Sequence, residues 1–159
     1  MGSRSKIDLA FIAGFLDGDG SLMLQIKKRK DGALKKRFMA TVCFYQDTRH
    51  EKDLYWIQEV FGIGYVSRRN DGMTELRING YTQVRNILEQ LLPFIRFKRI
   101  QARALYSAAK LLSEIPYRKL GKEQLRQLAT YILVIQNENY VTKKKKSEKE
   151  LLTIFGLTP

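Results

Sequence analysis

Hydrophobic and polar positions along the chain follow two periods, one typical of helices and one typical of strands. Apolar residues recur every three or four positions over residues 8–18, 50–61, 84–92, 98–113, 122–136 and 148–155, which predicts a helix over each range. Residues alternate one by one over 21–46, around Asp31-Gly32, and over 64–69 and 74–79, which predicts two β-hairpins. Asp8 is the expected N-cap of the first helix, and Pro93 ends the third.

The order of these elements predicts an α+β fold. An α-β-β-α-β-β-α core with one antiparallel sheet is followed by C-terminal helices. We expect one domain over residues 1–159, with a flexible start at 1–6, a loop at 114–121 and a basic C-terminal segment at 140–159.

Each predicted strand has one apolar face and one polar face. The polar face carries Met23, Gln25, Lys27, Arg29, Arg37, Met39, Thr41, Cys43, Tyr45, Arg69, Glu75, Arg77 and Asn79. Long polar side chains at regular spacing on a β-ribbon suit base edges in the DNA major groove. An ordinary amphipathic sheet facing water is the alternative, but there charges usually alternate in sign, whereas basic and amide groups dominate here.

The charge of the chain points to a polyanion. The net charge is +13 and the isoelectric point is about 9.9. No lysine or arginine occurs from Ile7 to Ile26, where the only charges are Asp8, Asp17 and Asp19. With 1 cysteine and 1 histidine, an internal disulfide is excluded, and cysteine-based zinc sites and serine triads are disfavoured. Hydrolysis would therefore rest on oxygen ligands and a hard cation. No apolar run is long enough to span a membrane, so we expect no membrane partner.

The segment FIAGFLDGDGS, residues 11–21, combines a close-packing helix face with acids at the helix end. Ala10, Gly14 and Gly18 form a flat stripe that lets a second helix approach. Acids at a helix C-terminus are electrostatically unfavourable, which suggests that they serve a cation. An EF-hand loop does not fit, because its sixth position would be Leu22 and its twelfth Lys28. Two interpretations remain: a structural C-cap with Gly20 left-handed, or a metal site shared across a twofold axis.

The same segment closely resembles the signature of the LAGLIDADG homing endonucleases. The likeness covers most of the chain and is closest to the single-motif homodimeric branch. It implies a metal-dependent DNA endonuclease that cuts both strands of a long pseudo-palindromic site and leaves 3′ overhangs. It also implies a homodimer formed through the motif helix, with an interface of Ala10, Ala13, Gly14, Asp17 and Gly18.

The resemblance assigns roles to individual residues. Asp19 and the carbonyl of Gly18 would bind metal, Gln46 would organise solvent, and Lys98 would stabilise charge. We expect Mg²⁺ as the cofactor, with Mn²⁺ able to substitute and Ca²⁺ supporting binding without turnover, and no small-molecule cofactor. A basic residue after the glutamine should reach the active-site phosphate, and this chain offers both Arg49 and His50. The lysines before the last helix would contact the DNA backbone, unless they form a solvated tail: Lys143, Lys144, Lys145 and Lys146.

Relatives of this branch are commonly encoded by introns of organellar or algal genes. The resemblance therefore implies an intracellular protein, of a chloroplast or mitochondrion if the gene lies in such an intron. Two rival functions share the fold: a non-cleaving, sequence-specific DNA-binding protein and an intron RNA maturase. The presence of Asp19, Gln46 and Lys98 argues against a degenerate, non-cleaving form.

Overall fold

The computed structural model describes residues 4–31, 36–139 and 143–158. Its elements are, in order, α1 (Lys6–Asp19), β1 (Gly20–Lys28), β2 (Lys36–Asp47), α2 (Lys52–Phe61), β3 (Tyr65–Arg68), β4 (Met73–Asn79), α3 (Tyr81–Leu91), α4 (Arg99–Glu114), α5 (Lys122–Glu138) and α6 (Glu148–Ile154). A 3-10 turn, Thr48–His50, precedes α2, and a second, Tyr117–Lys119, interrupts the predicted loop at 114–121. The order confirms the expected α+β fold.

The start of α1 differs from the expectation. Its N-cap is Ser5, not Asp8: the Ser5 hydroxyl accepts a hydrogen bond from the Ile7 amide at 3.2 Å. The Arg4 guanidinium donates to the carbonyls of Val60 and Phe61, each at 2.8 Å. These contacts join Arg4 to α2, and the expected flexible start at residues 1–6 stays a prediction; residues 1–3 lie outside the described residues.

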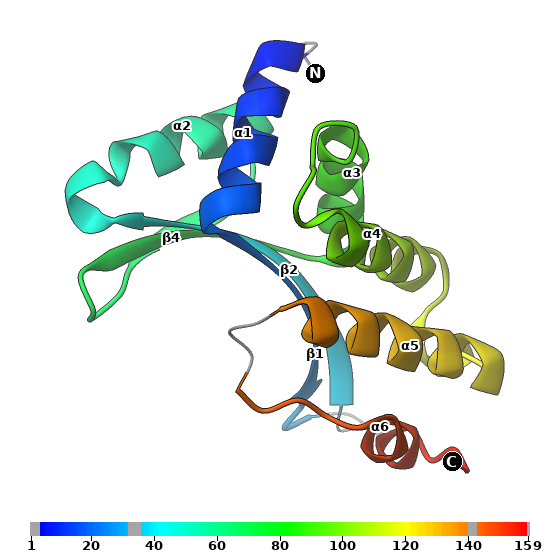
Figure 1. The fold of residues 1–159 in the computed structure, drawn as a ribbon. Coiled ribbons are helices and arrows are strands. Elements are labelled where there is room, and N and C mark those ends of the chain that lie inside the picture. Colours follow the sequence, from blue (N-terminus) through cyan, green and yellow to red (C-terminus); the bar gives the residue numbers. More distant parts are fainter. Residues whose placement is uncertain (1–3, 32–35, 140–142, 159) are drawn as a thin grey trace.

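The four strands form one antiparallel sheet in the order β1-β2-β4-β3. Gly20 of β1 pairs with Phe44 of β2, and Gln46 of β2 pairs with Thr74 of β4. Gly32, part of the predicted turn between β1 and β2, lies outside the described residues. Figure 1 shows the helices on one side of a strongly curved sheet and the concave face left open. With β2 and β4 in the centre and β1 and β3 at the edges, the sheet therefore leaves one broad face open for other contacts.

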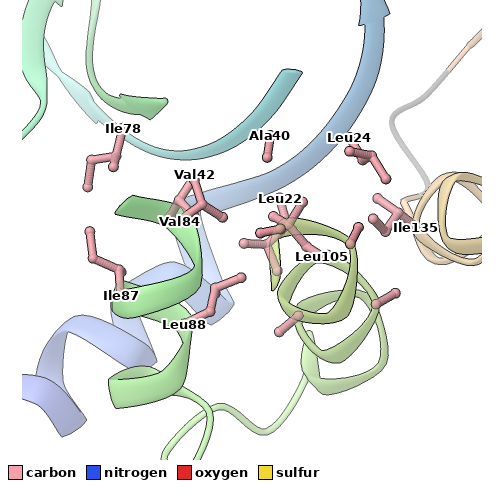
Figure 2. Close-up of a cluster of buried hydrophobic side chains, with 14 of the residues drawn as sticks. Leu22, Leu24, Ala40, Val42, Ile78, Val84, Ile87, Leu88, Leu105 and Ile135 are labelled. Carbon is pink, nitrogen blue, oxygen red and sulfur yellow. The ribbon is translucent and has the colours of Figure 1, made fainter. Parts of the chain in front are cut away.

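The core lies between the sheet and the helices. Figure 2 shows Leu22, Ala40 and Val42 pointing from the strands toward helix residues such as Val84 and Leu105. These side chains occupy the apolar alternation positions of the strands and the apolar stripes of α3 and α4. Burial of this face fixes which strand face remains for other contacts.

The C-terminal part packs on the rest of the chain. Leu151 and Leu152 of α6 are buried. The Lys146 amide donates to Gln136 Oε1 at 3.2 Å, and Gln136 Nε2 donates back to the Lys146 carbonyl. In the described part of the chain, no helix has both the length and the apolar character needed to cross a membrane.

Candidate active site

Helix α1 runs directly into strand β1 at Gly20, with no linker. Gly20 is extended (φ −115°, ψ 168°), and its amide donates to the carbonyl of Leu16. A Cβ atom there would lie 2.8 Å from that carbonyl oxygen, so the close approach of the two elements requires glycine. The expectation of a left-handed C-cap at Gly20 is therefore wrong.

The carboxylate of Asp17 is used inside the chain. It accepts backbone hydrogen bonds from Arg96 at 2.7 Å, Phe97 at 3.2 Å and Lys98 at 3.0 Å. These amides belong to the turn that precedes α4. The carboxylate therefore fastens the end of α1 to this turn, and the expected place of Asp17 at a dimer interface stays a prediction.

The side chain of Lys98 completes a reciprocal clamp. Its ammonium group donates to the carbonyls of Leu16 at 2.9 Å and Asp17 at 2.8 Å, in the last turn of α1, where the helix dipole places partial negative charge. Burial lowers the pKa of Lys98 from its usual value, while the nearby carboxylates of Asp17 and Asp19 oppose that shift. The fold thus places a half-buried cation beside Asp19, although the two residues lie far apart in the chain.

Asp19 differs from Asp17 in being exposed and free. Within the described ranges, its carboxylate has no hydrogen-bond or ion-pair partner, and neither does the Gly18 carbonyl. A free carboxylate beside a free carbonyl is a hard oxygen donor set that fits Mg²⁺. No group of three or more His, Cys, Asp or Glu side chains in the described residues could hold a metal. The oxygen donors at this helix end are one side chain and one backbone carbonyl, those of Asp19 and Gly18.

Gln46 lies at the same end of the sheet as Asp19. Gly20 and Phe44 are the last pair between β1 and β2 at this end of the sheet. Asp19 directly precedes Gly20, and Gln46 follows Phe44 by two positions, so both lie just beyond this pair. Gln46 Oε1 accepts a hydrogen bond from the next amide, that of Asp47, at 2.9 Å. The structure thus gathers Asp19, Lys98 and Gln46 around the end of α1.

The two basic candidates after Gln46 have different surroundings. Arg49 forms a two-pronged ion pair with Asp47, with its Nε and Nη2 atoms 3.0 and 2.9 Å from the carboxylate oxygens. This pairing holds the pKa of Asp47 well below its usual range. His50 is exposed. Both groups are open to solvent.

Comparison with known proteins identifies the family. The family model described as LAGLIDADG endonuclease matches residues 12–99. The chain belongs to this family. It is 37% identical over 109 residues to the DNA endonuclease I-CvuI of Chlorella vulgaris, which covers 69% of this chain and 68% of the relative. It is 29% identical over 145 residues to I-CreI of Chlamydomonas reinhardtii, covering 91% and 86%.

Solved structures of the family superimpose on nearly the whole chain. The I-CvuI structure with the I-CreI target and 2 mM Mg, in which the DNA is not cleaved, has a TM-score of 0.74 and 31% identity over 97% of this chain and 98% of that one. The structure of I-SmaMI bound to cleaved DNA has a TM-score of 0.74 at 19% identity, covering 98% of this chain but 50% of that one. In fold, this chain corresponds to one half of the larger LAGLIDADG protein.

The outer face of the LAGLIDADG helix α1 has no partner in the described chain. Ala10, Gly14 and Gly18 are exposed, and a Cβ atom on either glycine would meet nothing within 4 Å. Two large apolar residues, Ile7 (80% exposed) and Phe11 (64%), flank this stripe. Their spacing of four was a signal that our sequence interpretation did not use.

Ala13 is the exception among the predicted interface residues. It is fully buried and belongs to the core beneath α1, together with Ile12 and Leu16. Its assignment to a dimer interface is wrong, because the helix turns it toward its own sheet.

Two of the predicted DNA-contacting residues are closed off. Thr41 and Cys43 face the concave side but are fully buried. Both lie on β2, a central strand, and longer side chains of the neighbouring strands cover them. Thr41 donates to Asn79 Oδ1 at 2.6 Å, and the Cys43 thiol lies 4.0 Å from Glu75 Oε2. These two residues position the side chains that cover them, so their assignment to direct contacts is wrong.

The remaining predicted residues form a continuous polar surface. The exposed or half-buried members on the concave side and its rim are Met23, Gln25, Lys27, Arg29, Arg37, Met39, Tyr45, Arg69, Glu75, Arg77 and Asn79. Arg77 pairs with Glu75 at 3.1 Å, and Arg69 lies over the ring of Tyr45. The cross-strand neighbours of Arg77 and Glu75 on β3, Tyr65 and Ser67, also face this side and were missed, although their alternation with Arg69 could have revealed them.

The lysine run Lys143–Lys146 lies beside this surface. Lys144 and Lys146 line a groove together with Gln25 and Lys27 of β1. All four lysines of the run are exposed, and the backbone of Lys146 is fixed to Gln136. Because Gln136 anchors its backbone, the lysine run is better interpreted as a basic segment held against the fold than as a solvated tail.

Proposed function

We propose that this protein is a homodimeric homing endonuclease that uses a divalent metal to cut both strands of a specific DNA duplex. The observation that carries the proposal is the end of α1, where a free Asp19 carboxylate lies beside the half-buried cation of Lys98. Family membership and the named endonucleases I-CvuI and I-CreI support the same activity.

A second copy of the chain completes the site. The open stripe of Gly14 and Gly18 permits close packing with the same stripe on a twofold-related helix. Ile7 and Phe11 would be buried at its edges, which removes large apolar side chains from water. This packing brings the second Asp19 to the axis, so each strand of the duplex receives its own cleavage centre. The match of this chain to half of I-SmaMI supports the pairing.

Asp19 and the Gly18 carbonyl would hold the metal, and phosphate oxygens of DNA would fill further positions. A bound Mg²⁺ neutralises charge on the scissile phosphate and makes a water nucleophile available near neutral pH. Relatives crystallised with DNA in Mg or Ca support this choice of ion. Ca²⁺ should support binding without turnover, because its looser coordination positions ligands less strictly.

The other two residues act on the phosphate and on solvent. The ammonium of Lys98, oriented by two helix carbonyls, would place positive charge where the leaving oxygen develops negative charge. The carboxamide of Gln46 would orient the attacking water. If Arg49 is the group that binds the active-site phosphate, it must first break its ion pair with Asp47. His50 could bind the phosphate without breaking that ion pair.

The concave face would bind the duplex. Gln25, Arg77 and their neighbours would contact base edges in the major groove, and Lys143–Lys146 would contact phosphates. The relatives come from Chlorella and Chlamydomonas, in keeping with a gene carried by an organellar intron, which we propose for this protein.

The test is cleavage itself. The protein is incubated with a randomised duplex library and Mg²⁺, and the ends produced are sequenced; staggered 3′ overhangs at one related set of sites are expected. On the recovered site, Asp19→Asn should abolish cleavage yet bind normally in Ca²⁺. Asp53→Asn, the same change at an exposed position on α2, should cleave like the wild type.

Four outcomes would refute the proposal. Specific binding by the wild type without any cut would identify a non-cleaving DNA-binding protein, and preferential binding to folded intron RNA would identify a maturase. Full cleavage by Asp19→Asn, or unchanged activity in excess chelator, would refute the metal mechanism.

A further inference from the structure

Glu51 lies at the N-cap of α2 but does not cap it. Asp, Asn, Ser and Thr are preferred there because their short side chains bond to the first amides of the helix. The Glu51 side chain makes no such bond. It turns instead toward the sheet, which suggests that its use lies elsewhere.

The Glu51 carboxylate joins two strands to the segment that follows β2. It accepts hydrogen bonds from Arg68 Nη2 at 2.6 Å and from the Thr74 hydroxyl at 2.7 Å. The Thr74 hydroxyl also lies 2.9 Å from that of Thr48, whose amide donates to the Gly72 carbonyl at 2.9 Å. One carboxylate thus links β3, β4 and the 3-10 turn after Asp47.

The strand register leads from this network to the candidate active site. Arg68 pairs with Thr74, and Thr74 pairs with Gln46, so the three residues form one row across β3, β4 and β2. Neighbours in such a row share a sheet face, and cross-strand pairs contribute to the stability of a sheet. The position of Thr74 therefore bears on that of its partner Gln46.

The network is sheltered on one side and reachable on the other. Thr74 is fully buried, and the side chain of Glu51 is 15% exposed, whereas that of Arg68 is 71% exposed. The Arg68 guanidinium also holds the pKa of Glu51 below its usual range. The ion pair of Glu51 can therefore be removed by a substitution at the exposed Arg68, without disturbing the core.

We propose that Glu51 is a positioning residue for cleavage: it holds the strand end that carries Gln46 in register with the β3–β4 hairpin. This inference rests on the proposed endonuclease function. It predicts that hairpin and cleavage site behave as one rigid unit. Loss of the link should misplace Gln46 while leaving the concave face able to bind DNA.

The experiment compares Glu51→Gln with wild type on the cognate duplex. Single-turnover cleavage in Mg²⁺ should fall about tenfold or more, because small misplacements of a catalytic group are costly. The Kd measured in Ca²⁺ should stay within about threefold, since the face that binds DNA is intact. Arg68→Gln, a change at the exposed partner, should show the same loss and tests the link even if Glu51→Gln folds poorly.

A double-mutant cycle separates this role from a general loss of structure. In a Gln46→Ala background, Glu51→Gln should cost no more than about a further twofold in rate, because both changes act through one group. Asp71→Asn is the matched control: it breaks the Arg69–Asp71 ion pair of the same hairpin and should leave the rate unchanged.

Three results would overturn the inference. One is wild-type cleavage rates in both Glu51→Gln and Arg68→Gln. Another is a fall in rate matched by an equal fall in affinity and thermal stability, which would indicate a structural role. The third is full additivity with Gln46→Ala. A wild-type protein that does not cleave would refute the proposed function, and this inference with it.

Discussion

Replacing Asp17 by asparagine should destabilise the protein, whereas the same change at Asp19 should not. The two aspartates stand two positions apart at the end of α1. The Asp17 carboxylate accepts three backbone hydrogen bonds, but Asp19 is exposed and accepts none from the described residues. The pair therefore tests whether one acid serves the fold and the other the chemistry.

The size of the effect follows from the bonds that asparagine can keep. An amide side chain has one acceptor oxygen, so in Asp17→Asn the new side chain would retain either the bond at Oδ1 or the two at Oδ2. A hydrogen bond to a charged group contributes about 1.5 to 3 kcal/mol, and water can partly replace the bonds that face solvent. We expect a loss of about 1.5 to 3 kcal/mol for Asp17→Asn and a Tm lower by about 3 to 10 °C.

Asp19→Asn should change stability by less than about 1 kcal/mol. Removing an acid from a helix C-terminus relieves an unfavourable interaction with the helix dipole, worth about 0.3 to 1 kcal/mol. The lost attraction to Lys98 acts in the opposite direction. The two effects largely cancel.

Urea unfolding followed by tryptophan fluorescence is the assay. Trp56, on α2, is the 1 tryptophan of the chain. All variants are measured at one protein concentration, because the stability of a dimer depends on concentration. An unfolding midpoint of Asp17→Asn equal to wild type would refute the structural role. Equal losses for Asp17→Asn and Asp19→Asn would refute the division of roles.

Three other predictions follow from the site. Gly14→Leu should yield a folded monomer by light scattering and circular dichroism, because the site is open within one chain and only a second helix would clash; a dimer of wild-type affinity would contradict this. Burial lowers the pKa of Lys98 from 10.5, so as the pH rises kcat/KM should begin to fall earlier than for an ordinary lysine, because the cation is lost. An active Lys98→Arg variant should lack this fall, since arginine keeps its charge. The same fall at the same pH in Lys98→Arg would contradict the assignment. Each Lys→Ala change within Lys143–Lys146 should weaken binding to all sequences alike and lower the slope of log Kd against log salt by about 0.9 per lost phosphate contact. Gln25→Ala and Arg77→Ala should instead change which bases are preferred. If all of these variants lost affinity uniformly for every sequence, the sheet would recognise no sequence.

The sequence predicted the elements well because helices and strands depend on neighbouring residues. The alternation in β1, β2 and β4 and the apolar stripes of α3, α4 and α5 fix the buried face of each element, and the structure agrees with these faces. The acidic motif at the end of α1 could also be recognised from the sequence, since its small residues and carboxylates lie close together in the chain.

Exposure within the sheet depended on more than alternation. Thr41 and Cys43 occupy the polar face as predicted, yet both are fully buried. Alternation gives the direction of a side chain, but burial depends on which strands lie on either side and how long their side chains are. The order β1-β2-β4-β3 surrounds β2 with partners that cover these short residues.

The sequence by itself determined the helix and strand faces, the acidic motif and the surplus of positive charge. Tertiary structure alone decided that Asp17 bonds to residues 96–98, that Lys98 returns to the end of α1, and that Glu51 joins two strands to the turn after β2. Periodicity and propensity describe residues a few positions apart. A hydrogen-bond partner 80 positions away is chosen only when packing brings two helix ends together, because such bonds act over about 3 Å.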